Sequence, residues 1–298
     1  MKVAVIGLGK LGSIHLRIYR EIAEIKKIYA VDTDESKLID YKDLETLSNY
    51  RYLKDKVDLV SIATPTINHF EIAGFFLANK IPVLVEKPIT VDTAQAKKLI
   101  DLSKKNKTLL FVGHVERYNN AYIAAKKIIK NPLFIECHRL SLYPNRSLDI
   151  SVILDLMIHD LDLVLDLAKD DIRKVEAKGV KVLSPSEDIA NARITFKNGC
   201  VANITASRIS VKRERKIRIF MNRAYISLDY AQQTVEIYQK VGNEIKKEVL
   251  AIDKEEPLKK EIAHFVSMVR KKMFRLDYAE KSKNALELAI KIRKIVDK

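Results

Sequence analysis

Four ionisable residues recur at helical spacing within one apolar stretch near the middle of the chain. Asp155, His159, Asp162 and Asp166 lie in SVILDLMIHDLDLVLDL, residues 151–167. Their spacing predicts a single stripe along an α-helix of 3.6 residues per turn. A carboxylate one turn from an imidazole in apolar surroundings is typical of a proton-transfer site. The same stripe facing water is typical of an ordinary amphipathic helix, so the helix alone leaves both interpretations open.

A glycine-rich hexad near the N-terminus predicts a dinucleotide-binding turn. Its residues are Gly7, Leu8, Gly9, Lys10, Leu11 and Gly12. The first glycine permits a tight turn, the second lets backbone approach a pyrophosphate, and the third allows close packing of helix on strand. Asp32 ends the next strand, and its carboxylate would bind both ribose hydroxyls and repel a 2′-phosphate. We therefore expect NAD, with NADP as the weaker alternative, and we expect His15 in the intervening helix to be structural.

Strands and helices alternate through the first 115 residues. Apolar runs predict strands at 2–6, 28–31, 58–63, 82–85 and 108–112. Helical periodicity predicts helices at 13–26, 68–79 and 91–105, and a shorter helix at 42–49. This alternation predicts an α/β domain, a Rossmann doubly wound parallel sheet that binds its ligand beyond the carboxyl ends of the strands.

Polar residues follow two of these strands and mark the expected cofactor edge. Thr64 and Pro65 end one strand, with His69 at the start of the next helix, and Glu86 and Lys87 end another. Because the carboxyl ends of parallel strands meet at one edge, we assign all five to the cofactor site. Lys87 is also a candidate catalytic residue, since its ammonium would stabilise a developing alkoxide; the alternative is a surface lysine.

The pattern changes near residue 116, where strands begin to dominate. Strands are predicted at 133–140, 175–182, 190–196, 201–207, 216–221, 224–229 and 234–239. Helices are predicted at 121–130, 257–272 and 277–298, and Lys197-Asn198-Gly199 predicts a hairpin turn. An α+β domain with an open antiparallel sheet and helices follows from this pattern. We expect a Rossmann dinucleotide-binding domain at 1–115 and a substrate and oligomerisation domain at 116–298, whose last helix is a candidate to pack back on the first domain.

Composition narrows the class of protein. The 298 residues carry a net charge of +15, but lysines are mixed with glutamates as on the ion-paired surface of a heat-adapted protein, without a nucleic-acid recognition motif. No apolar run reaches the roughly 18 residues of a membrane span, and a strand begins directly after Met1, which argues against a signal peptide. Cys137 and Cys200 lack metal-like spacing and are expected to be buried free thiols. We expect a cytoplasmic protein with no metal site and no nucleic-acid or membrane partner.

These motifs together resemble those of the Gfo/Idh/MocA oxidoreductases over nearly the whole chain. The resemblance rests on the glycine hexad, Ala63-Thr64-Pro65 with His69, Glu86-Lys87-Pro88, and Asp155 with His159. It implies that Lys87, Asp155 and His159 converge beside the nicotinamide. It also implies that the antiparallel sheet mediates assembly into a homo-oligomer, a dimer or tetramer. One departure is visible, because the family often has glycine before the Asp/His helix where this chain reads DISV.

The resemblance implies an NAD(P)-dependent oxidoreductase acting on CH–OH groups. For a sugar hydroxyl we assign His159 as base, because an imidazole with an ordinary pKa of about 6.5 titrates near working pH. Asp155 would orient that imidazole or bind a neighbouring hydroxyl. The segments GHVERYN and YPNRSLDISVILDLMIHDLDLVL look most like those of family members that oxidise the 3-hydroxyl of UDP-N-acetylglucosamine. A dehydrogenase or reductase of a free sugar or polyol, and a non-catalytic NAD-binding sensor, are the alternatives.

Five further residues are candidate substrate contacts: Arg117, Tyr118, Arg139, Arg146 and Asp162. For Asp162 the alternative is a structural hydrogen bond. For Arg117 and Tyr118, just past the first domain, a role at the domain interface is an equal alternative. Arg139 and Arg146 flank the loop before the Asp/His helix, where guanidinium groups would bind a diphosphate in bidentate fashion or form surface salt bridges. Asp166, at the end of the stripe, is expected to be solvated.

Overall fold

The computed structural model describes residues 1–143 and 150–297. Contacts divide the chain into two compact units. The first comprises Met1–His114 with Leu258–Asn284, and the second comprises Val115–Pro257 with Ala285–Lys298. The chain passes from the first unit to the second between residues 114 and 115. Residues 258–284, in contrast, group with the first unit rather than with the second.

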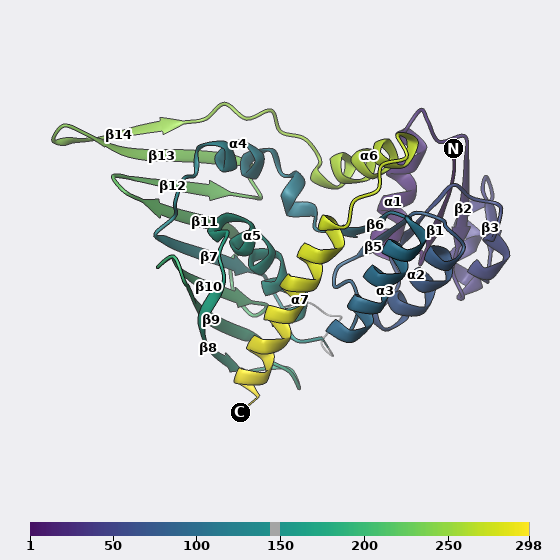
Figure 1. Ribbon diagram of the computed structural model, residues 1–298, viewed down its shortest axis with the longest axis horizontal. Coiled ribbons are helices and arrows are strands. Elements are labelled where there is room, and N and C mark those ends of the chain that lie inside the picture. The colour runs from purple at the N-terminus through teal and green to yellow at the C-terminus, as the bar shows by residue number, and fades with distance from the viewer. Residues whose placement is uncertain (144–149, 298) are drawn as a thin grey trace. The chain divides into compact units, whose positions relative to one another are not determined.

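The first unit is built on a six-stranded, all-parallel sheet in the order β3-β2-β1-β4-β5-β6 (Figure 1). Its strands are β1 Lys2–Ile6, β2 Lys27–Val31, β3 Glu45–Leu47, β4 Leu59–Ile62, β5 Val83–Glu86 and β6 Leu110–Gly113. Its helices are α1 Lys10–Glu21, α2 His69–Ala78, α3 Thr93–Asn106, α6 Pro257–Arg270 and the start of α7 Asp277–Val296. This strand order is that of a doubly wound Rossmann sheet, as predicted.

The strands of this sheet are apolar on both faces because helices cover both. All residues of β4, β5 and β6 are buried. α2 and α3 pack together, whereas α1 lies beside α6, joined by the Glu21–Lys259 and Glu24–Arg270 ion pairs (Figure 1). Crossovers that leave β1 and β4 in opposite directions open a crevice at the carboxyl ends of these two strands.

The predicted helix at 42–49 is wrong. Glu45–Leu47 forms the edge strand β3, which pairs in parallel with β2, and it lies between two short 3₁₀ turns, Glu35–Tyr41 and Tyr50–Leu53. No residue of the first 3₁₀ turn is buried. Short, exposed elements of this kind leave little hydrophobic periodicity for a sequence pattern to detect.

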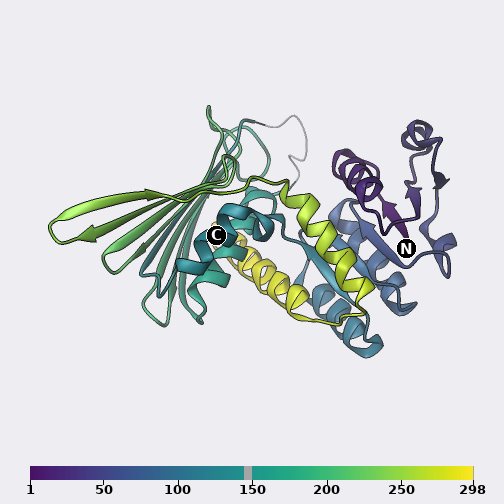
Figure 2. The ribbon, with the colours of Figure 1, turned by 90° about the horizontal axis from the view of Figure 1, so that it is seen from above.

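The second unit is built on an eight-stranded sheet in the order β14-β13-β12-β11-β7-β10-β9-β8. Its strands are β7 Phe134–Leu140, β8 Ile172–Val180, β9 Ile189–Phe196, β10 Val201–Ser207, β11 Glu214–Met221, β12 Ala224–Asp229, β13 Thr234–Val241 and β14 Glu244–Val249. Its helices are α4 Asn120–Ile128, α5 Ile158–Ala168 and the remainder of α7. Figure 2 shows α4 and α5 on the same face of this sheet.

The predicted antiparallel sheet is correct for every neighbouring pair except β7 and β10, which run parallel. The predicted hairpin turn joins β9 to β10, with Gly199 at φ +87°. Along β7 the residues alternate, so that Ile135, Cys137 and Arg139 are buried on the face that packs against α5. Cys137 and Cys200 are buried free thiols, as predicted.

The described residues contain neither a membrane-spanning helix nor a metal-binding cluster. No helix among residues 1–143 and 150–297 is long and apolar enough to cross a membrane. Within the same residues, no group of three or more His, Cys, Asp or Glu side chains is arranged to hold a metal ion.

Candidate active site

The glycine hexad forms the turn between β1 and α1. Gly7 has φ +90°, in the left-handed region that favours glycine, and α1 begins at Lys10. A Cβ at Gly12 would lie 1.8 Å from the carbonyl oxygen of Gly7, so only glycine lets α1 pack this closely on the turn. The N-terminus of α1 therefore lies at the carboxyl end of β1, where its N–H groups suit a phosphate.

A cavity of about 660 Å³ opens beside this turn. It is lined by residues from the ends of β1, β2 and β4, among them Gly9, Asp32, Thr64 and Pro65. The Asp32 carboxylate accepts hydrogen bonds from the backbone N–H of Leu8 at 2.7 Å and of Asp34 at 2.9 Å, which fix its orientation. Each oxygen has two lone pairs, so the carboxylate still has acceptor capacity for ribose hydroxyls.

Two features of this cavity fit a dinucleotide. A Cβ built at Gly9 meets no atom within 4 Å, which leaves open space where backbone would approach a pyrophosphate. Thr64 Oγ1 is buried and has no hydrogen-bond partner among the described residues, so a ligand hydroxyl or phosphate would satisfy it. Lys37 also lines the cavity, and its Nζ lies 3.5 Å from Asp32 Oδ2 in an ion pair.

His69 joins the two loops that follow β4 and β5. Its Nδ1 lies 2.9 Å from the carbonyl oxygen of Pro88, and its Nε2 lies 2.9 Å from that of Thr64. Burial lowers the pKa of His69, although the two carbonyls oppose this effect. A neutral ring carries one N–H and donates to one carbonyl at a time. Both ring nitrogens thus face protein atoms, and His69 connects the loop after β4 to the loop after β5.

Glu86 and His15 form a second buried contact under the same edge. His15 Nε2 lies 3.1 Å from Glu86 Oε1, and His15 Nδ1 lies 2.7 Å from the Ser61 hydroxyl. All three side chains are buried. These contacts connect α1, β4 and β5 directly behind Lys87, which follows Glu86 and is half-buried.

The predicted Asp/His helix begins with a wider turn than expected. Residues Ile153–Met157 form a π-helical turn, hereafter the π-turn, and regular α-helix α5 begins at Ile158. Asp155 therefore lies in the π-turn and His159 in the first turn of α5, and both are half-buried. The prediction of one uninterrupted α-helix is wrong here. A π-turn inserts an extra residue into the helix and often marks a functional site.

Asp162 and Asp166, the last two residues of the predicted stripe, bind cations of the same unit. Arg117 Nε and Nη2 each lie 2.6 Å from an Asp162 oxygen, a bidentate ion pair. Asp166 accepts hydrogen bonds from Tyr122 and Lys126, and its side chain is 6% exposed. The prediction that Asp166 is solvated is wrong. Burial alone would raise the pKa of Asp166, but the bonds from Lys126 and Tyr122 outweigh it and hold that pKa below its usual range.

Arg139 is committed to a buried ion cluster. Its Nε and Nη2 donate to Asp160 at 2.8 and 2.9 Å, and its Nη1 donates to Glu116 at 2.9 Å. The side chains are 4%, 2% and 9% exposed, respectively. Burial raises the pKa of Asp160, opposed by the Arg139 charge. Arg139 therefore holds α5 on β7, and the structure leaves its guanidinium no surface from which to bind a diphosphate.

The other two residues predicted to contact substrate are Tyr118 and Arg146. Tyr118 is half-buried in the short turn Val115–Tyr118. Arg146 lies outside the described residues.

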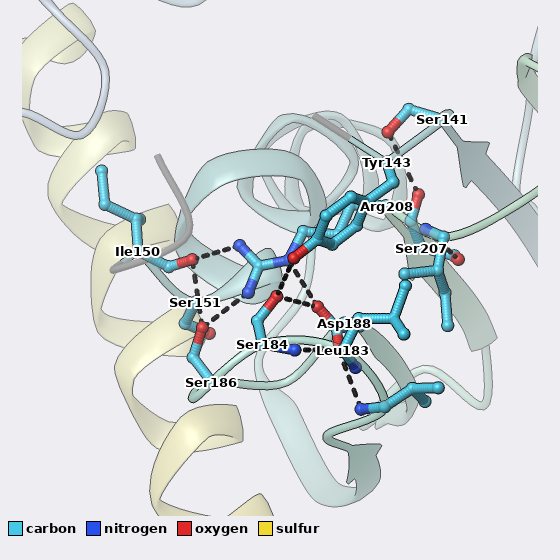
Figure 3. A network of polar contacts seen from close by, with 12 residues as sticks. Ser141, Tyr143, Ile150, Ser151, Leu183, Ser184, Ser186, Asp188, Ser207 and Arg208 are labelled. Atoms are coloured by element: carbon cyan, nitrogen blue, oxygen red, sulfur yellow. Dashed lines mark hydrogen bonds and ion pairs between the residues drawn. The ribbon is translucent and has the colours of Figure 1, made fainter. Parts of the chain in front are cut away.

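A second buried arginine, which the sequence analysis missed, lies next to the chain that leads into the π-turn. Arg208, immediately after β10, is 2% exposed and donates to Asp188, to the Ser186 hydroxyl and to the carbonyl oxygen of Ile150 (Figure 3). The only sequence signal was its place at the start of the basic run 208–218, which gave no reason to expect burial.

Comparisons with known proteins agree with this architecture. A model of the Gfo/Idh/MocA "Oxidoreductase family, NAD-binding Rossmann fold" matches residues 1–114, and a model of the Gfo/Idh/MocA C-terminal domain matches residues 134–227. The chain is 33% identical over 277 residues to UDP-N-acetylglucosamine 3-dehydrogenase of Acidithiobacillus ferrooxidans, covering 90% of this chain and 88% of that one. A solved structure of that enzyme has a TM-score of 0.92 at 32% identity and covers 100% of this chain and 98% of its own.

A second relative is more distant. The chain is 27% identical over 260 residues to myo-inositol 2-dehydrogenase of Thermotoga maritima, covering 78% of this chain and 77% of that one. Both relatives are dehydrogenases, and the similarity to each extends across both units. The chain belongs to the Gfo/Idh/MocA family of oxidoreductases, with an NAD-binding Rossmann domain at its N-terminus.

Proposed function

We propose that this protein is an NAD-dependent dehydrogenase that oxidises the 3-hydroxyl of UDP-N-acetylglucosamine, or of a related nucleotide sugar, to a ketone. The observation that carries the proposal is the 33% identity, over 90% of the chain, to an enzyme with that name. The inositol dehydrogenase relative supports the alternative of a polyol substrate, at lower identity and coverage.

The cofactor site follows from the first unit. Bound NAD⁺ would accept a hydride at its nicotinamide ring. The hexad residues Gly7 to Gly12 and the N-terminus of α1 would hold the pyrophosphate, and Asp32 would hold the ribose. Thr64 and Pro65 line the same cavity and would contact the cofactor directly. His69 and Glu86, whose side chains bind other protein groups, would act by holding the loops in place.

Three residues would carry the chemistry. His159 would take the proton from the substrate hydroxyl, and Asp155 would orient the imidazole or bind a neighbouring hydroxyl. Lys87 would hydrogen-bond the reacting oxygen and stabilise the alkoxide charge that develops on it. The support for these roles is the residue types, their positions at the end of β5 and the start of α5, and the family membership.

The ion pairs of Arg139 and Arg117 change which residues we propose as substrate contacts. We no longer propose Arg139 as a substrate contact, because Asp160 and Glu116 bind its guanidinium. Arg117 and Asp162 bind each other and would act on substrate only as a pair. Tyr118 and Arg146 stay proposed substrate contacts.

The function is tested by following NAD⁺ reduction at 340 nm with UDP-N-acetylglucosamine, other UDP-sugars and free polyols, and by locating the product carbonyl with mass spectrometry. We expect turnover of the UDP-sugar and a ketone at C3. Turnover of a polyol without turnover of any UDP-sugar would refute the substrate class.

Catalytic residues are tested on the same assay. Lys87→Ala and His159→Asn are each expected to lower kcat by about 10² to 10⁴-fold, the usual effect of removing a proton-transfer or charge-stabilising group. Lys97→Ala, an exposed lysine on α3, serves as the matched control and should retain wild-type kcat. If both active-site variants turned over like the control, Lys87 and His159 would not carry the chemistry. If the wild-type protein bound NAD⁺ but turned over no sugar or polyol, it would be a non-catalytic NAD-binding sensor.

We also propose a homo-oligomer that assembles through the face of the eight-stranded sheet opposite α5. Four rings form a ladder across neighbouring strands, with centroid distances of 5.7 Å, 5.3 Å and 4.4 Å: Phe134, Phe220, Tyr225 and Tyr238. Half-buried aromatic rows of this kind favour association. Analytical ultracentrifugation should give a dimer or tetramer, and Tyr225→Lys should shift it toward monomer; a monomeric wild type would refute the proposal.

A further inference from the structure

A buried ion pair between Arg208 and Asp188 lies beside the chain that leads into the π-turn, outside the proposed catalytic residues. Arg208 immediately follows β10 and Asp188 immediately precedes β9, and their side chains are 2% and 0% exposed. Arg208 Nε donates to Asp188 Oδ1 at 3.0 Å. A buried pair is weak evidence for stability by itself, because desolvation offsets the attraction between the charges. Its geometry therefore suggests another role.

The carboxylate of Asp188 organises the loop between β8 and β9. Its Oδ2 accepts the backbone N–H groups of Val182, Leu183 and Ser184 at 2.8, 2.6 and 3.0 Å (Figure 3). Burial alone would raise the pKa of Asp188, but these bonds and one from the Ser184 hydroxyl outweigh it and hold the pKa below its usual range. These contacts favour the ionised carboxylate and therefore its ion pair with Arg208.

The other end of Arg208 reaches the chain that enters the π-turn. Its Nη1 donates to the carbonyl oxygen of Ile150 at 2.7 Å, and its Nη2 donates to the Ser186 hydroxyl at 2.6 Å (Figure 3). The next residue, Ser151, accepts the N–H groups of Leu154 and Asp155 on its carbonyl oxygen, each at 3.0 Å. Two consecutive carbonyls therefore link the guanidinium to the backbone of Asp155.

We propose that Arg208 is a positioning residue for the dehydrogenase reaction: together with Asp188 and Ser186 it fixes the backbone at Ile150 and so sets the orientation of the Asp155 carboxylate. The π-turn makes this anchoring necessary. The first N–H of the π-turn, that of Ile153, is bound by the hydroxyl of Ser151 at 3.2 Å, so the turn is held through residues 150 and 151. Relaxing it to regular α-helix would rotate Asp155 relative to His159. This inference rests on the proposed catalytic roles of Asp155 and His159.

Two variants test the inference. Arg208→Lys keeps the positive charge beside Asp188 but replaces a planar fork of donors with a single ammonium, which cannot reach all three acceptors in the same geometry. We expect kcat to fall about 10 to 100-fold, KM for NAD⁺ to stay within about 2-fold, and the pH of half-maximal kcat to shift, because Asp155 no longer orients the base. Ser186→Ala removes one acceptor and should lower kcat about 2 to 5-fold without changing the melting temperature.

A control separates positioning from loss of stability. Val235→Ala, in a fully buried position on β13, should lower the melting temperature of the same unit without altering the π-turn. We expect this variant to retain kcat and its pH profile. If Arg208→Lys and Val235→Ala lost kcat in proportion to their melting temperatures, Arg208 would be merely structural and the inference would be overturned.

A measurement independent of catalysis completes the test. Hydrogen–deuterium exchange should show faster exchange of the Leu154 and Asp155 amides in Arg208→Lys, and unchanged exchange there in Val235→Ala. Unchanged exchange in both variants would overturn the inference even if the enzyme were active. Accelerated exchange in a protein with no dehydrogenase activity would instead refute the proposed function and leave the anchoring intact.

Discussion

Gly9 and Gly12 belong to the same turn but should fail in different ways when replaced by alanine. A Cβ at Gly9 meets no protein atom within 4 Å, and the residue has φ −67°, which alanine adopts readily. Gly9→Ala should therefore fold. Gly9 is the N-cap of α1, where alanine is a poor substitute, so we expect a loss of about 0.5–1 kcal/mol in unfolding free energy. For a domain of this size that lowers the melting temperature by about 1–4 °C.

In Gly12→Ala the added methyl group would clash with the backbone of the same turn. Its Cβ would lie 1.8 Å from the Gly7 carbonyl oxygen, whereas real Cβ contacts are essentially never under 3.0 Å, so α1 and the turn must separate by more than 1 Å. Overpacking of this kind costs about 1–3 kcal/mol or more. We expect a melting temperature at least about 2 °C lower, together with weaker cofactor binding as the turn moves.

The two variants are compared by thermal denaturation and by calorimetric titration with NAD⁺. In Gly9→Ala the added methyl occupies the space assigned to the pyrophosphate, so we expect Kd for NAD⁺ to rise at least about tenfold, equivalent to about 1.4 kcal/mol. Wild-type NAD⁺ affinity in Gly9→Ala would refute the placement of the pyrophosphate. A wild-type melting temperature in Gly12→Ala would refute the packing argument.

Two further predictions concern carboxylates. Asp32→Ala should raise KM for NAD⁺ and lower the NAD⁺ to NADP⁺ ratio of kcat/KM at least about tenfold, measured by steady-state kinetics; an unchanged ratio would contradict the assignment of Asp32 to the ribose. Asp166→Asn should destabilise the fold by about 1–3 kcal/mol at neutral pH. Because the folded-state pKa of Asp166 is lowered, its contribution is complete above the ordinary aspartate pKa of about 3.9 and is lost as pH falls toward the folded-state pKa. Chemical denaturation of both proteins should therefore show a constant difference at pH 5–8 that shrinks below about pH 4.

The parallel sheet could be read from the sequence because its strands are buried on both faces. Leu59–Ile62 and Val83–Glu86 are short apolar runs that end in turn residues, and their positions were predicted to within two residues. β14 was missed for the opposite reason. All of Glu244–Val249 is exposed, and the segment is mostly charged, so it carries no alternation between apolar and polar residues.

A local sequence pattern cannot predict structural features that depend on residues far away in the sequence. The parallel pairing of β7 with β10 joins strands more than sixty residues apart. Asp166 resembled a solvated aspartate because nothing in its own helix shows that Lys126 and Tyr122 lie against it. The π-turn escaped for a related reason, since apolar periodicity over seventeen residues does not distinguish one wide turn from a regular one.

The ion pairs of the second unit indicate which groups on α5 hold the helix in place and which are suited to proton transfer. Carboxylates that are removed from water require a cation or several donors, and Asp160, Asp162 and Asp166 each have one or more basic partners in this unit. These three serve packing, because they attach α5 to β7, to the turn at 115–118 and to α4. Asp155 and His159 lie above them, half-buried and at the end of the helix where the wide turn begins. The proposed acid–base pair is therefore placed by a helix whose other charges hold it rigid, and that rigidity is what a proton-transfer geometry requires.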